Sequence, residues 1–282
     1  MLPHCIYYTT NKRKRDVNFR LNKYFFYFQC KGGRIKTQHK RKVALVTGGR
    51  TGIGRAISIA LAALSIDVAV NYSRSQQEAL DTVAAIEKNG GKAIVVQANV
   101  AKDAEVRTMV QTVVEQFGQL DYLVNCAGTT VYVDMPDLEG LKPEYWDEIM
   151  DVNVKGLFSV CRAAAPHLKI THGSIVNITS VAGITGMGSS IAYAASKAAA
   201  ISVTKSLARV LAPEVRVNSV APGIVLTRWV EGREAHVKKL GEHTPLGRCC
   251  NAEDVADVAV PLLVNATMMT GQTVVVDGGA FL

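Results

Sequence analysis

Apolar and polar positions follow two alternating patterns from residue 43 to the end of the chain. Short runs rich in Val, Ile, Leu and Ala alternate with longer segments in which apolar residues recur every three or four positions. The short runs predict strands at residues 43–46, 68–71, 93–97, 120–125, 174–179, 215–220 and 273–276. The longer segments predict helices at residues 56–64, 75–88, 103–117, 143–168, 193–210 and 252–264. This alternation favours a single α/β domain, doubly wound, with a mainly parallel seven-stranded sheet flanked by helices.

The first 42 residues do not fit this pattern. They contain 12 of the chain's 32 Lys and Arg residues but only one acid, Asp16, together with eight of its 18 Phe, Trp and Tyr residues. One interpretation is a targeting segment or a segment that binds an anionic surface, since basic, acid-poor leaders direct proteins to organelles. We favour the other interpretation, a translation start placed too far upstream. Residues 1–40 are then expected to be a disordered or poorly packed extension, and residues 41–282 the folded domain.

The net charge of +8 originates in that extension. Residues 1–42 carry a net charge of +11, whereas the remaining 240 residues carry 20 basic and 23 acidic side chains, a net of −3. A mildly acidic body gives no reason to expect a nucleic-acid partner, and the sequence has no run of 18 apolar residues to span a membrane. The six cysteines show neither a metal-ligand spacing nor a disulfide framework. We therefore expect a reducing compartment, the cytoplasm.

A glycine-rich turn joins the first predicted strand to the first predicted helix. It reads Thr47-Gly48-Gly49-Arg50-Thr51-Gly52-Ile53-Gly54, and an alanine-rich, helix-periodic segment follows. Glycines allow a tight turn and a close approach of the backbone to a pyrophosphate, while the helix N-terminus supplies free N–H groups and a positive dipole. Strand, turn and helix stand in the order that a dinucleotide site requires. The spacing Thr-Gly-x-x-x-Gly-x-Gly differs from the common Gly-x-Gly-x-x-Gly pattern.

Tyr193 and Lys197 stand four residues apart in a predicted helix, so their side chains lie on one face, one turn apart. A phenol holds its proton up to a pH of about 10. A nearby ammonium group favours the phenolate and lowers the pKa of the phenol, which allows proton transfer near neutral pH. Taken alone, this spacing is more often an ordinary helix-surface pair. The upstream Ser180 and the glycine-rich turn favour a catalytic role.

These motifs together resemble those of the short-chain dehydrogenase/reductase family, and the resemblance covers about residues 41–282. They are the glycine-rich turn, the Asn125-Cys126-Ala127-Gly128 turn, Asn153, Ser180, Tyr193 with Lys197, Pro222-Gly223, and Gly271-Gln272 with Asp277-Gly278-Gly279. The resemblance implies a Rossmann-type fold and an enzyme that interconverts a ketone and a secondary alcohol. The alternative is a dinucleotide-binding sensor without turnover. Such relatives typically lack the Tyr or the Lys, and this chain has both.

The resemblance also implies roles for four catalytic residues. Tyr193 would donate a proton to the carbonyl oxygen during reduction, and Lys197 would lower the pKa of Tyr193 and hydrogen-bond the nicotinamide ribose. Ser180 would hold and polarise the substrate oxygen, although alone it could equally be a strand-end cap. Asn153 would bind a water that links Lys197 to solvent, although alone it is more often a structural amide inside a helix.

The end of the second predicted strand indicates which nicotinamide cofactor binds. Enzymes that use NAD place an acid there, whereas the present chain has Asn71-Tyr72-Ser73-Arg74, with Arg50 in the glycine-rich turn. Ser73, Arg74 and Arg50 are expected to hold a 2′-phosphate, so NADP(H) is predicted over NAD(H), although Arg74 could simply be a solvated surface arginine. No metal is expected. The further cofactor contacts that the resemblance implies are Gly48, Thr51, Gly52, Ile53, Gly54, Asn99, Val100, Asn125, Ala127, Gly128, Tyr193, Lys197, Pro222, Gly223, Ile224 and Thr227.

The substrate is expected to be a small-molecule or carrier-bound ketone. Similar relatives include 3-oxoacyl-acyl-carrier-protein reductases, which give the main hypothesis of a 3-oxoacyl thioester, and dehydrogenases of sugars or other secondary alcohols, which give the alternative. Residues 181–191 are small and apolar and favour an acyl group. Residues 224–250 are expected to form an irregular, partly helical insertion. Its basic residues could dock an acidic carrier protein or form a solvated lid face: Arg228, Arg233, His236, Lys238, Lys239 and Arg248.

Members of the family are usually tetramers, so a homotetramer is expected. The sequence offers apolar residues for its interfaces: Ala164, Ala165, Ala200, Val203, Leu207 and Val276. One departure from the family concerns Cys250, where relatives usually have Gly. A turn that needs a positive φ would be strained by Cys, so this position is expected to disturb the lid.

Overall fold

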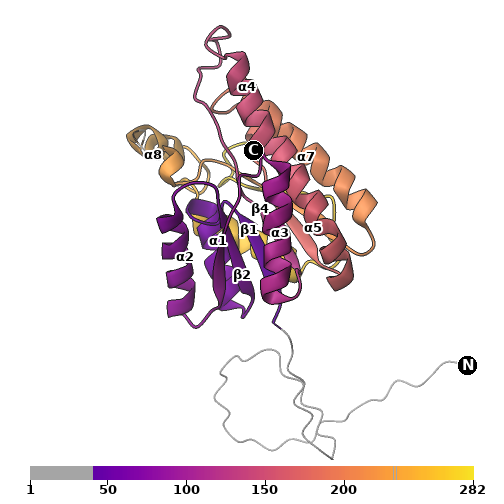
Figure 1. The fold of residues 1–282 in the computed structure, drawn as a ribbon. Helices are drawn as coiled ribbons and strands as arrows, with labels where there is room; N and C mark the ends of the chain where they lie inside the picture. Colours follow the sequence, from indigo (N-terminus) through magenta and orange to yellow (C-terminus); the bar gives the residue numbers. More distant parts are fainter. Residues whose placement is uncertain (1–40, 231, 233) are drawn as a thin grey trace, which may run out of the picture. The chain divides into compact units, whose positions relative to one another are not determined.

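The computed structural model describes residues 41–230, 232 and 234–282. Residues 1–40, on which the predicted extension falls, lie outside the described part. The chain forms one seven-stranded sheet in the order β3-β2-β1-β4-β5-β6-β7, and every neighbouring pair is parallel (Figure 1). The predicted α/β architecture is therefore confirmed. The strands are β1 (Val43–Thr47), β2 (Asp67–Tyr72), β3 (Ala93–Gln97), β4 (Tyr122–Asn125), β5 (Ser174–Ile178), β6 (Arg216–Pro222) and β7 (Thr273–Val276).

Each predicted helix is present, and one of them has an unpredicted irregularity. The helix expected over 143–168 consists of α4, a π-helical segment η1 and α5, which follow one another without a break. None of the helices in the described part combines the length and apolar character needed to cross a bilayer. The helices are α1 (Gly52–Ala63), α2 (Gln76–Lys88), α3 (Asp103–Phe117), α4 (Pro143–Met150), η1 (Asp151–Gly156), α5 (Leu157–Thr171), α6 (Ala182–Thr185), α7 (Ile191–Leu211), the 3₁₀ turn η2 (Arg228–Val230), α8 (Glu234–Glu242) and α9 (Ala252–Val264).

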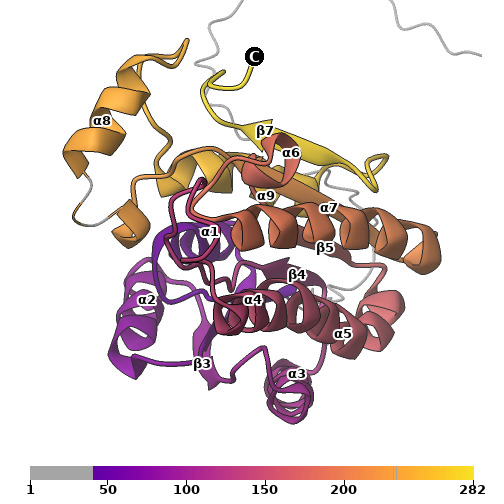
Figure 2. The same cartoon turned by 90° about the horizontal axis from the view of Figure 1, so that it is seen from above.

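Alternate residues of each central strand face two separate cores, because successive side chains of a strand point to opposite faces. Val43 and Leu45 of β1 pack with residues of α3, α5 and α7. Ala44 and Val46 pack on the other face with residues of α1, α2 and α9. Figure 2 shows α3, α5 and α7 side by side along the first of these faces. Burial on both sides explains why the strands are continuous apolar runs.

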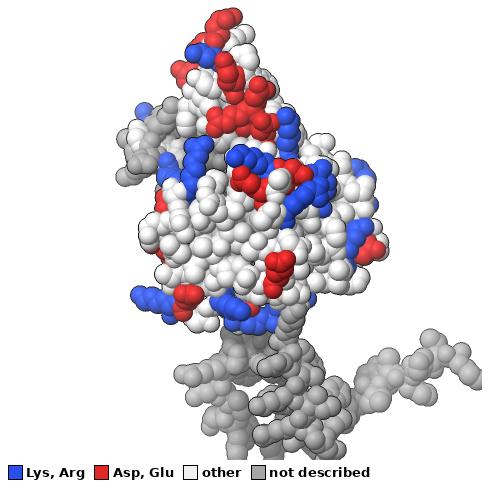
Figure 3. Space-filling view, viewed as in Figure 1, with Lys and Arg blue, Asp and Glu red and all other residues white. Residues whose placement is uncertain are grey.

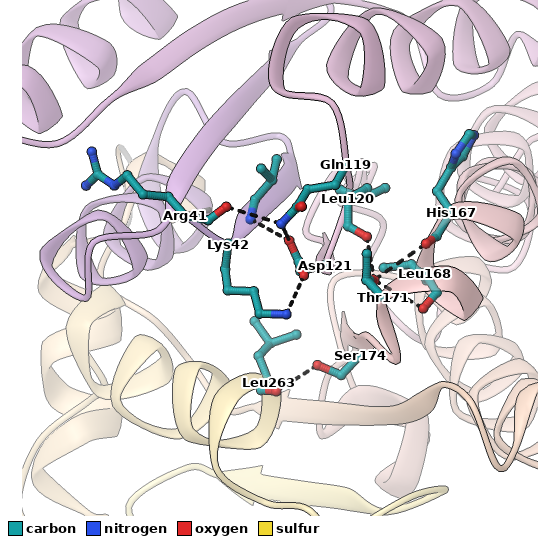
Figure 4. Close-up of polar contacts among 11 residues, drawn as sticks. Arg41, Lys42, Gln119, Leu120, Asp121, His167, Leu168, Thr171, Ser174 and Leu263 are labelled. Carbon is teal, nitrogen blue, oxygen red and sulfur yellow. Dashed lines mark hydrogen bonds and ion pairs between the residues drawn. The ribbon is translucent and has the colours of Figure 1, made fainter. Parts of the chain in front are cut away.

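A polar cluster around Asp121 fixes the start of β1 against β4 (Figure 4). The carboxylate of Asp121 is 1% exposed and accepts hydrogen bonds from Lys42 Nζ at 2.7 Å, Val43 N at 2.8 Å and Gln119 Nε2 at 2.7 Å. Gln119 also donates to the carbonyl of Arg41. These contacts hold the first described residues of the chain at the amino end of the sheet, opposite to the edge where the glycine-rich turn lies.

The strand order reverses between β1 and β4, since β2 and β3 lie on one side and β5, β6 and β7 on the other. In open parallel sheets, ligands bind in the crevice outside the carboxyl ends of the strands at such a switch point. The glycine-rich turn follows β1, and the turn that begins at Asn125 follows β4. The two turns predicted to bind a cofactor therefore lie next to each other.

Residues 224–250 form the expected partly helical insertion, with η2 and α8. The expected strain at Cys250 is a wrong prediction. Cys250 does not have a positive φ, and it pairs with Val225 in an isolated parallel bridge. The positive φ of this turn, +70°, belongs instead to Gly247, where a residue without Cβ adopts it at little cost.

Candidate active site

A cleft of about 1300 Å³ opens at the carboxyl ends of the strands. Pockets for single small molecules occupy roughly 300–1,000 Å³, so this cleft has room for a dinucleotide and a substrate together. Most of the predicted site residues line it: Gly48, Arg50, Thr51, Gly52, Ile53, Ser73, Arg74, Asn99, Val100, Ala127, Gly128, Ser180, Tyr193, Lys197, Pro222, Gly223, Ile224 and Thr227. Gly54, Asn125 and Asn153 do not line the cleft. They pack against or hydrogen-bond the segments that do.

Gly54 shows why the glycine-rich turn needs its residue types. A Cβ at this position would lie 2.4 Å from the carbonyl oxygen of Gly48, which is closer than any real Cβ contact. The absence of a side chain therefore lets the first turn of α1 pack directly on the loop. The loop is fixed from the other side by Asn71, whose Oδ1 accepts a hydrogen bond from Gly48 N at 3.2 Å. The result is a cradle with the N-terminus of α1 directed at the cleft.

Tyr193 and Lys197 project from α7 into the same cleft, as predicted. Lys197 Nζ lies 5.6 Å from the centroid of the Tyr193 ring and donates a hydrogen bond to the carbonyl of Ile178 at 3.0 Å. Ser180 lies two residues beyond the end of β5, lines the same cleft, and lowers the pKa of Tyr193 through its hydroxyl. Its Oγ also accepts a bond from Ala182 N at 3.1 Å, so Ser180 caps the end of the strand and faces the reacting centre at once.

The pKa of Tyr193 departs from the sequence prediction. Burial raises it to about 12, against the lowering effect of the hydrogen bond from Ser180. Burial also lowers the pKa of Lys197 to about 8. The spacing predicted that Lys197 would lower the pKa of Tyr193, and this direction is wrong for the protein alone. Removal from water disfavours the charged form of both groups, and this is the largest cause of each shift.

Asn153 holds the loop after β4 in place. Its Oδ1 accepts a hydrogen bond from Thr129 N at 2.9 Å, and its Nδ2 donates to Thr129 O at 2.9 Å and to Ser196 Oγ at 3.0 Å. The residue is 2% exposed and lies within the π-helical segment η1. These bonds support a positioning role. The predicted water relay to Lys197 stays a prediction.

Asn125 supports the site through the sheet. Its Nδ2 donates to Asn177 Oδ1 at 2.9 Å, and Asn177 Nδ2 donates to Thr204 Oγ1 at 2.9 Å. This buried chain of amides joins β4 and β5 to α7, the helix that carries Tyr193 and Lys197. These buried hydrogen bonds fix the relative position of the elements they join.

Four charged residues gather where the predicted 2′-phosphate site lies. Arg50 forms an ion pair with Glu78 of α2, and Arg228 Nη1 lies 3.7 Å from the same Glu78 oxygen. Burial lowers the pKa of Arg50, as do the nearby positive charges of Arg228 and Arg74. The structure thus brings the two predicted arginines together. Arg228 and Glu78 also belong to this cluster. Arg228 reaches Glu78 only because the insertion folds back over the cleft, and local sequence patterns do not predict this contact.

Comparisons with known proteins agree with this geometry. A solved structure described as a short-chain dehydrogenase/reductase from Burkholderia xenovorans superposes with a TM-score of 0.81 at 33% identity, over 86% of this chain and 99% of the other. Another, from Mycobacterium ulcerans, gives 0.78 at 30% identity, over 85% and 89%. A family model described as enoyl-(acyl carrier protein) reductase matches residues 48–280. The chain belongs to the short-chain dehydrogenase/reductase family.

Curated relatives within this family carry more specific names. A protein named as ketoacyl reductase 2 of the granaticin polyketide synthase of Streptomyces violaceoruber is 44% identical over 85% of this chain and 96% of its own length. The 3-oxoacyl-acyl-carrier-protein reductase of Synechocystis is 42% identical over 84% and 96%. That of Staphylococcus epidermidis is 39% identical over 86% and 99%. As a member of the short-chain dehydrogenase/reductase family, the protein is an oxidoreductase that acts on the CH–OH and C=O groups of its substrate.

Two aromatic residues complete the site of this short-chain dehydrogenase/reductase: Trp229 of the insertion, and Tyr132, which sequence reasoning missed. Trp229 of η2 lies against Tyr193, with ring centroids 5.9 Å apart. Tyr132 donates from its hydroxyl to the carbonyl of Trp229 at 2.7 Å. Both line the cleft together with Met187 and Val230. Tyr132 lies in a long loop without periodicity, and only a search for aromatic residues near the catalytic segments could have suggested it.

Proposed function

We propose that the protein is an NADP(H)-dependent reductase of 3-oxoacyl thioesters. The observation that carries this proposal is the position of Tyr193 and Lys197 in one cleft with the glycine cradle and with Arg50 and Arg74. The names of the relatives support the thioester. The apolar end of the cleft, which includes Met187 and Trp229, supports an acyl chain over a polyol.

The residues present fit a dinucleotide. Residues of the cradle, Gly48 and Arg50 to Ile53, line the cleft at the N-terminus of α1, where a pyrophosphate would bind. The end of β2 carries Ser73 and Arg74 and no acid, and Arg50 faces the same region. Guanidinium groups form charge-assisted, bidentate bonds with phosphate. These features support NADP(H) over NAD(H).

The chemistry that we propose needs one proton and one hydride for each ketone. When bound, the reduced nicotinamide supplies the hydride. Tyr193 gives its proton to the carbonyl oxygen, and the hydroxyl of Ser180 holds that oxygen. The high pKa of Tyr193 keeps the proton in place until charge develops on the substrate. Lys197, with a pKa of about 8, can gain or release a proton near neutral pH and so can return one toward Tyr193.

The surface beside the cleft bears on how the ketone is delivered. Figure 3 shows acidic residues gathered on the projecting part of the molecule around α4. Of the basic insertion, Arg228 pairs with Glu78 and Arg248 with Asp254. Arg233 and the side chains of His236 and Lys238 lie outside the described part. Because the acids around α4 would repel an acidic carrier, we propose that the site recognises the acyl thioester rather than the carrier. The exposed acids are Asp134, Asp137, Glu139, Glu144, Asp147 and Glu148.

Oxidation of NADPH, followed by its absorbance, tests the proposed activity. We expect turnover with 3-oxoacyl thioesters of coenzyme A and of N-acetylcysteamine, similar kcat/KM values for carrier-bound and coenzyme A-bound acyl groups, and a kcat at least about 100-fold lower for Tyr193→Phe. Turnover of sugar ketones but not of thioesters would favour the alternative dehydrogenase. Binding of NADPH without oxidation on any ketone would favour the sensor.

We further propose a homotetramer in the cytoplasm. Of the apolar residues predicted for interfaces, Ala164, Ala200 and Leu207 belong to the protomer core, so an interface must use others. Phe158 of α5 and Val275 of β7 are 43% and 45% exposed and are better candidates. The four cysteines of the described part are free thiols, which supports a reducing compartment. Light scattering after size exclusion would detect the assembly, and a monomer at micromolar concentration would contradict it.

A further inference from the structure

Three consecutive residues of the insertion contact three different parts of the cleft. A Cβ on Gly52 would lie 3.2 Å from the methyl group of Thr227, so Thr227 covers the glycine cradle. Arg228 reaches Glu78 on α2. Trp229 lies against Tyr193. The segment 227–229 therefore connects the adenosine end of the cleft to the catalytic end.

The contact of Arg228 differs from an ordinary surface ion pair because its partner is shared. One oxygen of Glu78 faces both Arg50 and Arg228. The Arg50 side chain is only 14% exposed, whereas those of Glu78 and Arg228 are 39% and 44% exposed. Arg50 also experiences the charge of Arg74. Two guanidinium groups thus converge on a single anionic oxygen, with a third guanidinium nearby.

The charges of this cluster match a phosphate group. Three guanidinium groups carry +3 and Glu78 carries −1, which leaves a net charge of +2. A phosphate monoester carries about −1.5 to −2 near pH 7. An unphosphorylated ribose hydroxyl would leave the excess charge uncompensated. The cluster therefore has the charge that distinguishes a 2′-phosphate from a 2′-hydroxyl.

We propose that Arg228 is a third guanidinium for the 2′-phosphate of the cofactor, and that this phosphate takes over from Glu78 as the anion that holds Arg228. The inference rests on the proposed NADP(H) dependence and deepens it. Because Trp229 follows Arg228 directly, binding of the phosphate fixes the segment that covers Tyr193. Recognition of the cofactor's adenosine end is thereby coupled to closure over the proton donor.

Calorimetric binding of adenosine 2′,5′-bisphosphate and of 5′-AMP separates this role from a purely structural one. We expect Arg228→Gln and Arg74→Gln each to weaken binding of the bisphosphate by about tenfold, with binding of 5′-AMP unchanged. The matched control is Lys239→Gln, an exposed charge on α8, which should leave both affinities as they are. Glu78→Gln removes the competing anion and should tighten binding of the bisphosphate.

Two results would overturn the inference while leaving the proposed function intact. In the first, the wild-type protein binds the bisphosphate more tightly than 5′-AMP, and the Arg228→Gln variant shows the same ratio of affinities. The other is weaker binding of the bisphosphate by Glu78→Gln. A wild-type protein that binds both nucleotides equally would overturn the NADP(H) proposal itself, and this inference with it.

Hydrogen exchange gives a second measurement of the coupling. The bisphosphate should protect backbone amides of residues 226–230 more than 5′-AMP does, because only the bisphosphate engages Arg228. The extra protection should disappear in Arg228→Gln and persist in Lys239→Gln. Equal protection by the two nucleotides in the wild-type protein, despite tighter binding of the bisphosphate, would contradict the coupling to the segment.

Discussion

The ring of Trp229 lies against the ring of Tyr193, with centroids 5.9 Å apart and planes inclined by 60°. This tilted contact is a favourable geometry for two aromatic rings. It places an apolar surface from the insertion over the side chain that we propose as the proton donor. Exclusion of water by such a surface is what raises the pKa of a phenol. Burial is likewise the largest cause of the raised pKa of Tyr193, about 12.

Tyr193→Phe should lower kcat for ketone reduction by roughly 10²–10⁴-fold, the usual contribution of a positioned general acid. The phenyl ring keeps the contact with Trp229, so the fold and the cleft should be preserved. Single-turnover oxidation of NADPH measures the effect, and the dissociation constant of NADPH is the control. A variant that keeps more than a tenth of the wild-type rate would mean that another group supplies the proton.

Lys197→Met should stabilise the protein at neutral pH, although Lys197 is proposed to be catalytic. Burial lowers the pKa of Lys197 from 10.5 to about 8. Below pH 8 both the folded and the unfolded chain carry the proton, and the buried charge costs about 3 kcal/mol. Between pH 8 and 10.5 the unfolded chain binds more protons, so this penalty disappears as the pH rises. The variant's advantage should therefore be greatest below pH 8.

Denaturant unfolding of both proteins at pH 7 and at pH 10 checks this sign. The difference in the free energy of unfolding should shrink at the higher pH. Cys126 and Tyr193 have raised pKa values, about 11 and about 12, and destabilise the folded protein as the pH rises. Both residues are present in the two proteins, so their effect cancels in the difference apart from the Coulombic interaction between Cys126 and Lys197. The lost hydrogen bond to Ile178 reduces the gain by about 1 kcal/mol. A constant difference across this pH range would show that the ammonium is not desolvated.

The sequence was sufficient for the parts of the site that are built by neighbouring residues. A strand, a glycine turn and a helix N-terminus are local features, so the cradle of residues 47–54 could be predicted from order and residue type. The Tyr193 and Lys197 pair likewise follows from helical spacing. Parallel strands bring their carboxyl ends to one edge, and this placed the Asn125 turn beside the cradle.

The missed features depend on contacts between distant segments. Spacing shows that Lys197 is a neighbour of Tyr193 but not that both are buried, so it gave the wrong direction for the pKa of Tyr193. The apolar pattern of η1 is the same as that of an α-helix. The sequence therefore did not predict the π-helical turn. Trp229 and Arg228 acquire their partners only when the insertion folds back over the cleft. The irregular pattern of residues 224–250 gives no information on that approach.

Asn153→Ala should lower kcat by loosening the loop that begins at Gly128. The substitution leaves the backbone N–H and C=O of Thr129 and the hydroxyl of Ser196 without the amide. Each buried group left unpaired costs about 1–3 kcal/mol. Hydrogen exchange should be faster at residues 128–134 than in the wild-type protein. Full loss of activity without any change in exchange would instead favour the water relay.

Asp121→Asn should destabilise the fold by about 2–3 kcal/mol without changing kcat or KM. The buried carboxylate accepts three hydrogen bonds at the amino end of the sheet, away from the cleft. The matched comparison is Lys42→Met, because the Lys42 side chain is 51% exposed and such a pair contributes about 1 kcal/mol or less. Denaturant unfolding should give a clearly lower free energy of unfolding for Asp121→Asn than for Lys42→Met. Equal losses would mean that the backbone bond to Val43 contributes little.

Trp229→Ala should weaken the use of long acyl chains more than that of short ones. Trp229 lines the apolar end of the cleft and is 37% exposed, so a long chain can bury further indole surface. Burial contributes about 25 cal/mol per Å² of apolar area, and loss of some 60 Å² would reduce kcat/KM for a long-chain thioester by about tenfold. Acetoacetyl thioesters, which carry only a methyl group beyond the reacting carbonyl, should lose much less kcat/KM. Trp229→Phe keeps an aromatic surface, so its kcat/KM for long-chain thioesters should lie between those of the wild-type protein and Trp229→Ala. Steady-state kinetics over a series of chain lengths gives the answer. An equal loss at every chain length would show that Trp229 acts on Tyr193 alone and does not contact the acyl chain.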